Sequence, residues 1–94
     1  MNKLEQARKI INEVDSEMAK LFEKRMDAVK AVIEYKLENS MEIYDASREE
    51  EVIERNLKNI QNEEYKDYYR EYIINMMKLS KQYQQKIKED VQGE

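Results

Sequence analysis

Hydrophobic and polar residues recur with a helical period from Leu4 to Leu37, and this pattern predicts one long helix. Counted in heptads, two adjacent seams form the apolar stripe that such a helix turns toward a partner. The first seam holds Leu4, Ile11, Met18, Arg25 and Val32, and the second holds Arg8, Asp15, Phe22, Val29 and Lys36. An unpaired charge on a buried face is costly. The cations on this stripe therefore indicate a buried anion as their partner.

The predicted length of this helix points to an assembly of two chains. At 1.5 Å per residue the helix is about 50 Å long, whereas a compact chain of this size is only about 25 Å across. The chain cannot cover such a helix by itself. We therefore expect an intertwined homodimer in which the two long helices run antiparallel.

The rest of the chain predicts a short helix and a second long one. Ser47 is the expected N-cap of the short helix, with Glu50 completing a capping box, and the helix should end near Gln61. Asn62 begins the next break, and the last helix should cover about residues 64–89, with a frayed tail at 90–94. The apolar stripe of the short helix is Val52, Ile53, Leu57 and Ile60; that of the last helix is Tyr65, Tyr69, Tyr72, Ile73, Met76 and Met77, continued by Ser80, Gln84 and Ile87.

Composition supports an all-α fold of three helices, long-short-long, in a single domain over residues 1–94. The chain has one glycine and no proline, too few turn residues for an all-β or α/β domain. Its net charge is −4 with no basic block, which argues against a nucleic-acid partner. No stretch reads as a signal peptide or a membrane span, so we expect a cytoplasmic protein without a membrane partner. Histidine and cysteine are absent, and we expect no metal and no cofactor.

Polar residues on the apolar stripes form a candidate site. They are Arg8, Arg25, Lys36, Ser80 and Gln84, together with Arg48 and Glu49, which face the same way as the stripe of the short helix. Such donors suit a small molecule with at least two carboxylates and some ether or hydroxyl oxygens. Taken singly, each residue also has an ordinary explanation, because long side chains bury their stems while the charged heads reach water. The set as a whole favours an anion site.

At this point the sequence resembles the all-helical chorismate mutases, from about Leu4 to Gln85. Four motifs at the family's spacing carry the resemblance: Arg8 with Asp15; Glu23 and Arg25 followed by Lys36; Asp45 with Arg48 and Glu49; and Ser80 with Gln84. The resemblance implies a homodimer of three-helix chains with two equivalent sites. It also implies isomerisation of chorismate to prephenate, on the route to phenylalanine and tyrosine.

The resemblance also implies a role for each site residue. Arg25 and Arg8, the latter from the partner chain, would bind the two carboxylates of chorismate, and Ser80 would assist. Lys36 and Gln84 would hydrogen-bond the ether oxygen. Glu49 and the main chain near Asp45 would hold the ring hydroxyl, while Arg48 would contact a carboxylate or orient its neighbours. The implied catalytic residues are thus Lys36, Gln84, Arg25 and Glu49.

The implied reaction is a concerted pericyclic rearrangement, which needs neither proton transfer nor a covalent intermediate. It therefore fits a chain without histidine and cysteine. Gln84 donates a hydrogen bond at any pH, so we expect activity over a broad range around neutral pH. Lys81 departs from the family, which often has an apolar residue there, and either extends outward or adds a cation at the pocket mouth.

Two other functions remain open at this stage. An isochorismate pyruvate-lyase would share the fold and use a similar cationic pocket, although Asp45, Arg48 and Glu49 at this spacing look more like the mutases. A non-catalytic dimerisation module would explain the amphipathic first helix but not the cations on buried stripes. The short chain leads us to expect no amino-acid-sensing domain and no feedback control within it.

Overall fold

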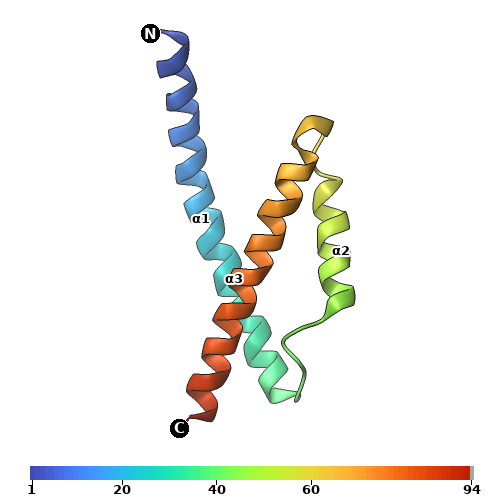
Figure 1. Ribbon diagram of the computed structural model, residues 1–94. Helices are drawn as coiled ribbons and strands as arrows, with labels where there is room; N and C mark the ends of the chain where they lie inside the picture. Colours follow the sequence, from blue (N-terminus) through green and yellow to red (C-terminus); the bar gives the residue numbers. More distant parts are fainter. Residues whose placement is uncertain (94) are drawn as a thin grey trace.

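The computed structural model describes residues 1–93 and places them in three α-helices and one short 3-10 helix. These are α1 (Lys3–Glu38), α2 (Ala46–Leu57), η1 (Glu63–Tyr65) and α3 (Lys66–Gln92). The long and short helices follow the predicted order, and the all-α fold is confirmed. In Figure 1, α1 and α3 cross as two long diagonals, and α2 lies alongside the first half of α3. None of the described helices has the length and apolar character needed to cross a membrane.

The ends of α1 are fixed by local hydrogen bonds. The Asn2 side chain accepts a hydrogen bond from the backbone N–H of Glu5 at 2.8 Å, which satisfies one of the free donors at the start of the helix. At the other end, Ser40 has a φ of 53°, in the left-handed region, and the chain turns away there. The predicted long helix is therefore confirmed nearly to the residue.

The prediction for the start of α2 was wrong. Asp45, not Ser47, is the N-cap, and its carboxylate accepts from the backbone N–H of Arg48 at 3.1 Å. The Ser47 hydroxyl donates to the same carboxylate at 2.9 Å, so it supports the cap instead of forming it. Both residue types cap helices well, and the sequence pattern does not choose between two such residues two positions apart.

The predicted end of α2 near Gln61 was also too late, because the helix ends at Leu57. The backbone N–H groups of Asn59 and Ile60 bond three residues back, to Asn56 and Leu57, and this tighter turn closes the helix. At the far end of the chain α3 continues to Gln92, so the part of the expected frayed tail at residues 90–92 is helical instead. Residue 94 of that tail lies outside the described residues.

The core lies where α2 packs on α3. Ile53, Ile73 and Met77 are buried together there, and Val52, Leu57 and Tyr69 pack against them. On α1, Ile33 is fully buried, with 0% of its surface exposed. This small core holds α2 and the second half of α1 against α3 and so fixes the walls of the site described below.

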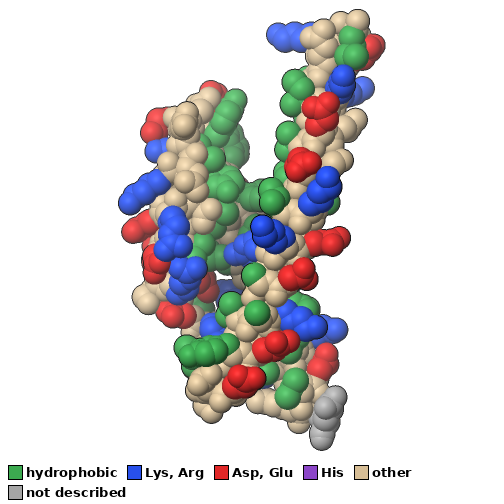
Figure 2. Space-filling model, turned by 180° about the vertical axis from the view of Figure 1, so that it is seen from behind, with side chains coloured by type: hydrophobic (Ala, Val, Ile, Leu, Met, Phe, Trp, Pro, Cys, Tyr) green, Lys and Arg blue, Asp and Glu red, His purple; other side chains and the backbone are tan. Residues whose placement is uncertain are grey.

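The first half of α1 projects beyond the other helices, and with it the chain has a longest dimension of 56 Å (Figure 1). Its apolar stripe is uncovered: Leu4 is 57% exposed, Ile11 55% and Phe22 40%. Figure 2 shows hydrophobic side chains on both sides of the hollow between this projecting half and the other helices. The prediction that the chain cannot cover its own first helix is confirmed. Arg8 and Asp15, placed on the buried stripe by the heptad count, are exposed in the single chain.

Candidate active site

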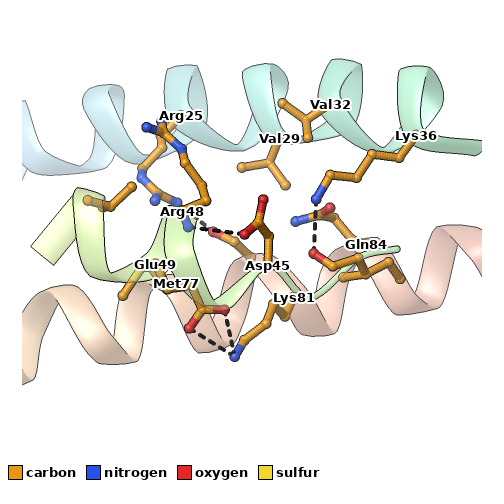
Figure 3. A pocket seen from close by; sticks show the side chains of 13 residues that line it. Arg25, Val29, Val32, Lys36, Asp45, Arg48, Glu49, Met77, Lys81 and Gln84 are labelled. Carbon is orange, nitrogen blue, oxygen red and sulfur yellow. Dashed lines mark hydrogen bonds and ion pairs between the residues drawn. The ribbon is translucent and has the colours of Figure 1, made fainter. Parts of the chain in front are cut away.

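A cavity of about 190 Å³ lies between the second half of α1, the start of α2 and the middle of α3. Seven of the predicted site residues line it: Arg25, Lys36, Asp45, Arg48, Glu49, Ser80 and Gln84. In Figure 3, Arg25 and Arg48 lie toward one end of the cavity and Lys36 and Gln84 toward the other, with Asp45 between them. Arg8 is the predicted residue that does not line it.

Arg25 is half-buried, and α3 holds its guanidinium. One of its terminal nitrogens donates a short hydrogen bond to the Ser80 hydroxyl, and that hydroxyl donates to the backbone carbonyl of Met76 at 2.9 Å. Ser80 is itself buried. This chain of bonds joins α1 to α3 and fixes the arginine fork at one end of the cavity, where it can bind a carboxylate in bidentate fashion.

Lys36 and Gln84 define the opposite end. The Lys36 ammonium donates to the backbone carbonyl of Ile43 at 2.9 Å, which ties the last turns of α1 to the connection that follows. Gln84 is 7% exposed, and its side-chain carbonyl oxygen is the buried side-chain polar atom without a hydrogen-bond partner among the described residues. Buried polar groups normally have partners, so this oxygen is an acceptor that a hydroxyl or N–H donor of a ligand in the cavity would satisfy.

Asp45 lies at the surface side of the cavity with its carboxylate turned to the start of α2. Its pKa is held below the ordinary value mainly by the hydrogen bond from the Arg48 backbone N–H, with further lowering by the Ser47 hydroxyl and the charge of Lys36. Arg48, which follows in the first turn, is more than half exposed and pairs with Glu51 at 3.0 Å. An exposed pair of this kind is weak, so the Arg48 side chain is free to turn to a ligand.

The sequence analysis left two positions possible for the Lys81 side chain, and the structure places it in the cavity wall. Its ammonium contacts both oxygens of Glu49, at 3.1 and 3.3 Å. It also lies 5.0 Å from the centre of the Tyr44 ring, a cation–π distance. The interpretation that Lys81 extends outward was therefore wrong. A pairing with Glu49 was not predicted, because Glu49 and Lys81 are far apart in sequence and only the packing of α2 on α3 brings them together.

The charges around the cavity favour an anion. Four cations and two carboxylates line it, which leaves two positive charges in excess: Arg25, Lys36, Arg48 and Lys81 against Asp45 and Glu49. A small molecule with two carboxylates matches this excess. The side chains can bind, orient and donate hydrogen bonds, but this set has no activated nucleophile.

The sequence analysis missed the apolar part of the wall. It consists of Val29, Val32, Ile43, Val52 and Met77. All of these except Ile43 were assigned to helix stripes, but an apolar residue on a stripe reads equally as core. The available signal was their position within one turn of Arg25, Lys36, Arg48 or Ser80 along a helix.

The fold and the cavity thus define an all-helical protein with a cationic site for a small dianion. Residues 7–85 match the family described as chorismate mutase type II, and the chain belongs to this family. It is accordingly an isomerase with chorismate mutase activity. No match was found among curated proteins or among solved structures.

Proposed function

We propose that this protein converts chorismate to prephenate in the cytoplasm, on the route to phenylalanine and tyrosine, as a homodimer with two equivalent sites, and that residues 1–94 act as one catalytic domain. One observation carries the proposal: residues of three of the four sequence motifs line a single cavity, in a chain that belongs to the chorismate mutase type II family. Arg25 and Lys36 lie at opposite ends of that cavity. No cofactor and no metal enter this proposal, and neither does a nucleic-acid or membrane partner.

In the proposed reaction one carbon–oxygen bond of chorismate breaks while a carbon–carbon bond forms within the same molecule. No atom leaves, and no proton has to be transferred. The work of the site is to hold the folded conformer and to stabilise charge that grows on the ether oxygen. A rigid set of donors around a small cavity is suited to both tasks.

Lys36 and Gln84 are the proposed donors to the ether oxygen. Both lie at the same end of the cavity, and Gln84 is buried there, so its amide N–H groups are the ones that would donate to the ether oxygen. Arg25, steadied by Ser80, would bind one carboxylate from the other end. Glu49 and the main chain near Asp45 would hold the ring hydroxyl, and Arg48 would contact a carboxylate from the rim.

The proposed partner of Arg25 is Arg8 of the second chain. Within one helix the two arginines are about 25 Å apart and cannot meet on one small ligand. An antiparallel pair of α1 helices that crosses between Ser16 and Glu17 would place the partner's Arg8 beside Arg25. The same register would place Ile11 opposite Phe22 and so cover two of the exposed apolar residues.

A second feature supports the pairing of α1 with the same helix of a second chain. A groove of about 440 Å³ lies beside the catalytic cavity, and apart from Arg25 its wall consists of apolar and aromatic residues: Met18, Leu21, Phe22, Tyr69, Tyr72 and Met76. Exposed apolar surface of this extent marks an interaction site. The first helix of a second chain, with its matching stripe, is the segment that would fill it.

A thermal-shift measurement tests the site separately from turnover. A bicyclic dicarboxylate that mimics the transition state should raise the unfolding temperature of the wild-type protein, because a ligand that binds only the folded state stabilises it. Arg25→Ala should abolish the shift, while Lys30→Ala, an exposed cation on the same helix, should leave it unchanged. An undiminished shift in Arg25→Ala would refute the site, and no shift in the wild type would favour the non-catalytic dimerisation module.

A further inference from the structure

The contact between Lys81 and Glu49 is not explained by the substrate-binding roles proposed for the other cavity residues. Lys81 stands on α3 directly after Ser80, and Glu49 stands in the first turn of α2. The ammonium reaches both carboxylate oxygens, and the two side chains are only 37% and 25% exposed. Figure 3 shows them pointing toward one another at the α3 side of the cavity.

We propose that Lys81 is a positioning residue that holds the Glu49 carboxylate in place for the ring hydroxyl of the substrate. This inference rests on the proposed function, because it assigns Lys81 a task only if Glu49 binds that hydroxyl. A glutamate side chain has several freely rotating bonds, and a free carboxylate at a cavity rim would sample many orientations. A cation that contacts both oxygens restricts it to a few.

Tyr44 gives the lysine a fixed position of its own. The Lys81 ammonium lies 5.0 Å from the centre of the Tyr44 ring, so it is held from the connection before α2 as well as from α2 itself. Lys81 thereby joins three parts of the cavity wall: the 39–45 connection, the first turn of α2 and the middle of α3. Misplacement of a substrate-binding group by about 1 Å can cost about a hundredfold in rate, so this clamp acts on the rate of rearrangement.

The alternative task for Lys81 is direct attraction of the dianionic substrate. That task would appear mainly as a raised KM when the charge is removed, and it would not depend on Glu49. A clamp acts through Glu49 and leaves the carboxylates of the substrate to Arg25 and the partner's Arg8. The two tasks are therefore separable by kinetics.

The test is a double-mutant cycle on chorismate turnover with Lys81→Met, Glu49→Gln and the double variant. Methionine keeps the apolar stem of Lys81 and removes its charge. We expect Lys81→Met to lower kcat about tenfold with KM changed less than about twofold, and to have almost no further effect in the Glu49→Gln protein. Lys81→Arg should restore most of the rate, because arginine keeps the charge and can reach the same carboxylate.

The matched control is Lys86→Met, which removes an ion-paired lysine of the same helix that pairs with Asp90 away from the cavity. It should turn over chorismate like the wild type. Unchanged kcat in Lys81→Met, or an equal loss with and without the Glu49 carboxylate, would overturn the clamp while leaving the proposed function intact. Absence of turnover by the folded wild-type protein would instead remove the proposed function and the clamp with it.

Discussion

Gln84 contributes an amide where many binding sites use an ionisable group. It is buried at the end of the cavity that also holds Lys36. An amide can donate to the ether oxygen whether the solution is acidic or alkaline, whereas a carboxyl group can donate only when it is protonated. Under the proposed function, the identity of this residue would therefore govern how activity depends on pH.

We predict that wild-type turnover is nearly constant on the alkaline side of about pH 6, and that Gln84→Glu is active only in acid. Burial raises the pKa of a carboxyl group at this position, and activity falls as the pH rises through that pKa and the group loses its proton. Rate profiles of the two proteins over about pH 5–8 check this. Parallel profiles would show that residue 84 does not donate to the reacting oxygen.

Asp45 links stability to pH through its role as helix cap. Its folded-state pKa is lowered, first by the Arg48 backbone N–H and then by the Ser47 hydroxyl, so the carboxylate stabilises the fold fully above the ordinary value of 3.8. That contribution is lost as the pH falls through the lowered folded-state pKa. Asparagine caps equally well but gains no proton.

We therefore predict that acid destabilises the wild-type protein more than Asp45→Asn, and that Asp45→Ala is less stable than both at neutral pH. Unfolding temperatures from circular dichroism between about pH 3 and about pH 7 measure the difference. Identical acid profiles for wild type and Asp45→Asn would contradict the assignment of Asp45 as the cap.

At the scale of single residues, the sequence predicted most of the polar residues that line the cavity but not their contacts. Arg25, Lys36, Ser80 and Gln84 could be placed because a polar residue on an apolar helix stripe is conspicuous. The Lys81–Glu49 pair could not be placed, since a helical wheel does not say which face of α3 meets the start of α2. Contacts between residues distant in sequence depend on packing, which periodicity does not specify.

Among the elements, α1 carries one fully buried apolar side chain, in addition to the Arg25–Ser80 hydrogen bond that joins it to α3. Ile33 is fully buried, whereas most of α1 is exposed in the single chain. We predict that Ile33→Ala lowers the free energy of unfolding by about 2–5 kcal/mol, the usual range for an isoleucine truncated in a core. Ile74→Ala on α3, where the side chain is 44% exposed, should cost less than half as much. Equal losses in urea unfolding would show that the crossing does not depend on Ile33.

The lengths of the elements followed from the sequence more closely than their ends. The long amphipathic run predicts a single helix over the length of α1, and a chain with one glycine has few positions at which a helix would break. The errors at Ser47, Gln61 and the last turn of α3 all concern helix termini. There, local hydrogen bonds decide between neighbouring residues of similar propensity.

For the whole molecule, we expect a dimer, because the apolar stripe on the first half of α1 is uncovered in the single chain. We predict that Ile11→Cys combined with Phe22→Cys forms a disulfide between two chains under mild oxidation, because the proposed register sets these positions opposite each other. The chain has no cysteine of its own, so no other disulfide competes. The control, Glu13→Cys with Lys20→Cys, lies at the same level of the crossing but on the opposite face of α1.

Non-reducing electrophoresis separates the outcomes. A covalent dimer from the first pair but not from the second supports the antiparallel crossing and hence the delivery of the partner's Arg8 to the site. A monomer from both pairs, or cross-linking in the control alone, would contradict the register. The expectation of a dimer rests on helix length, whereas the expected register rests on the seam positions of both chains.

The most direct test is chorismate turnover by the purified protein, with the product separated and identified by chromatography. The proposed function predicts prephenate from the wild type and nearly none from Arg25→Ala or Lys36→Ala, both still folded. Loss of one preorganised donor costs about 2.7–4 kcal/mol of transition-state stabilisation. Pyruvate in place of prephenate would identify a lyase instead, and wild-type turnover by a folded Arg25→Ala protein would show that the cavity described here is not the active site.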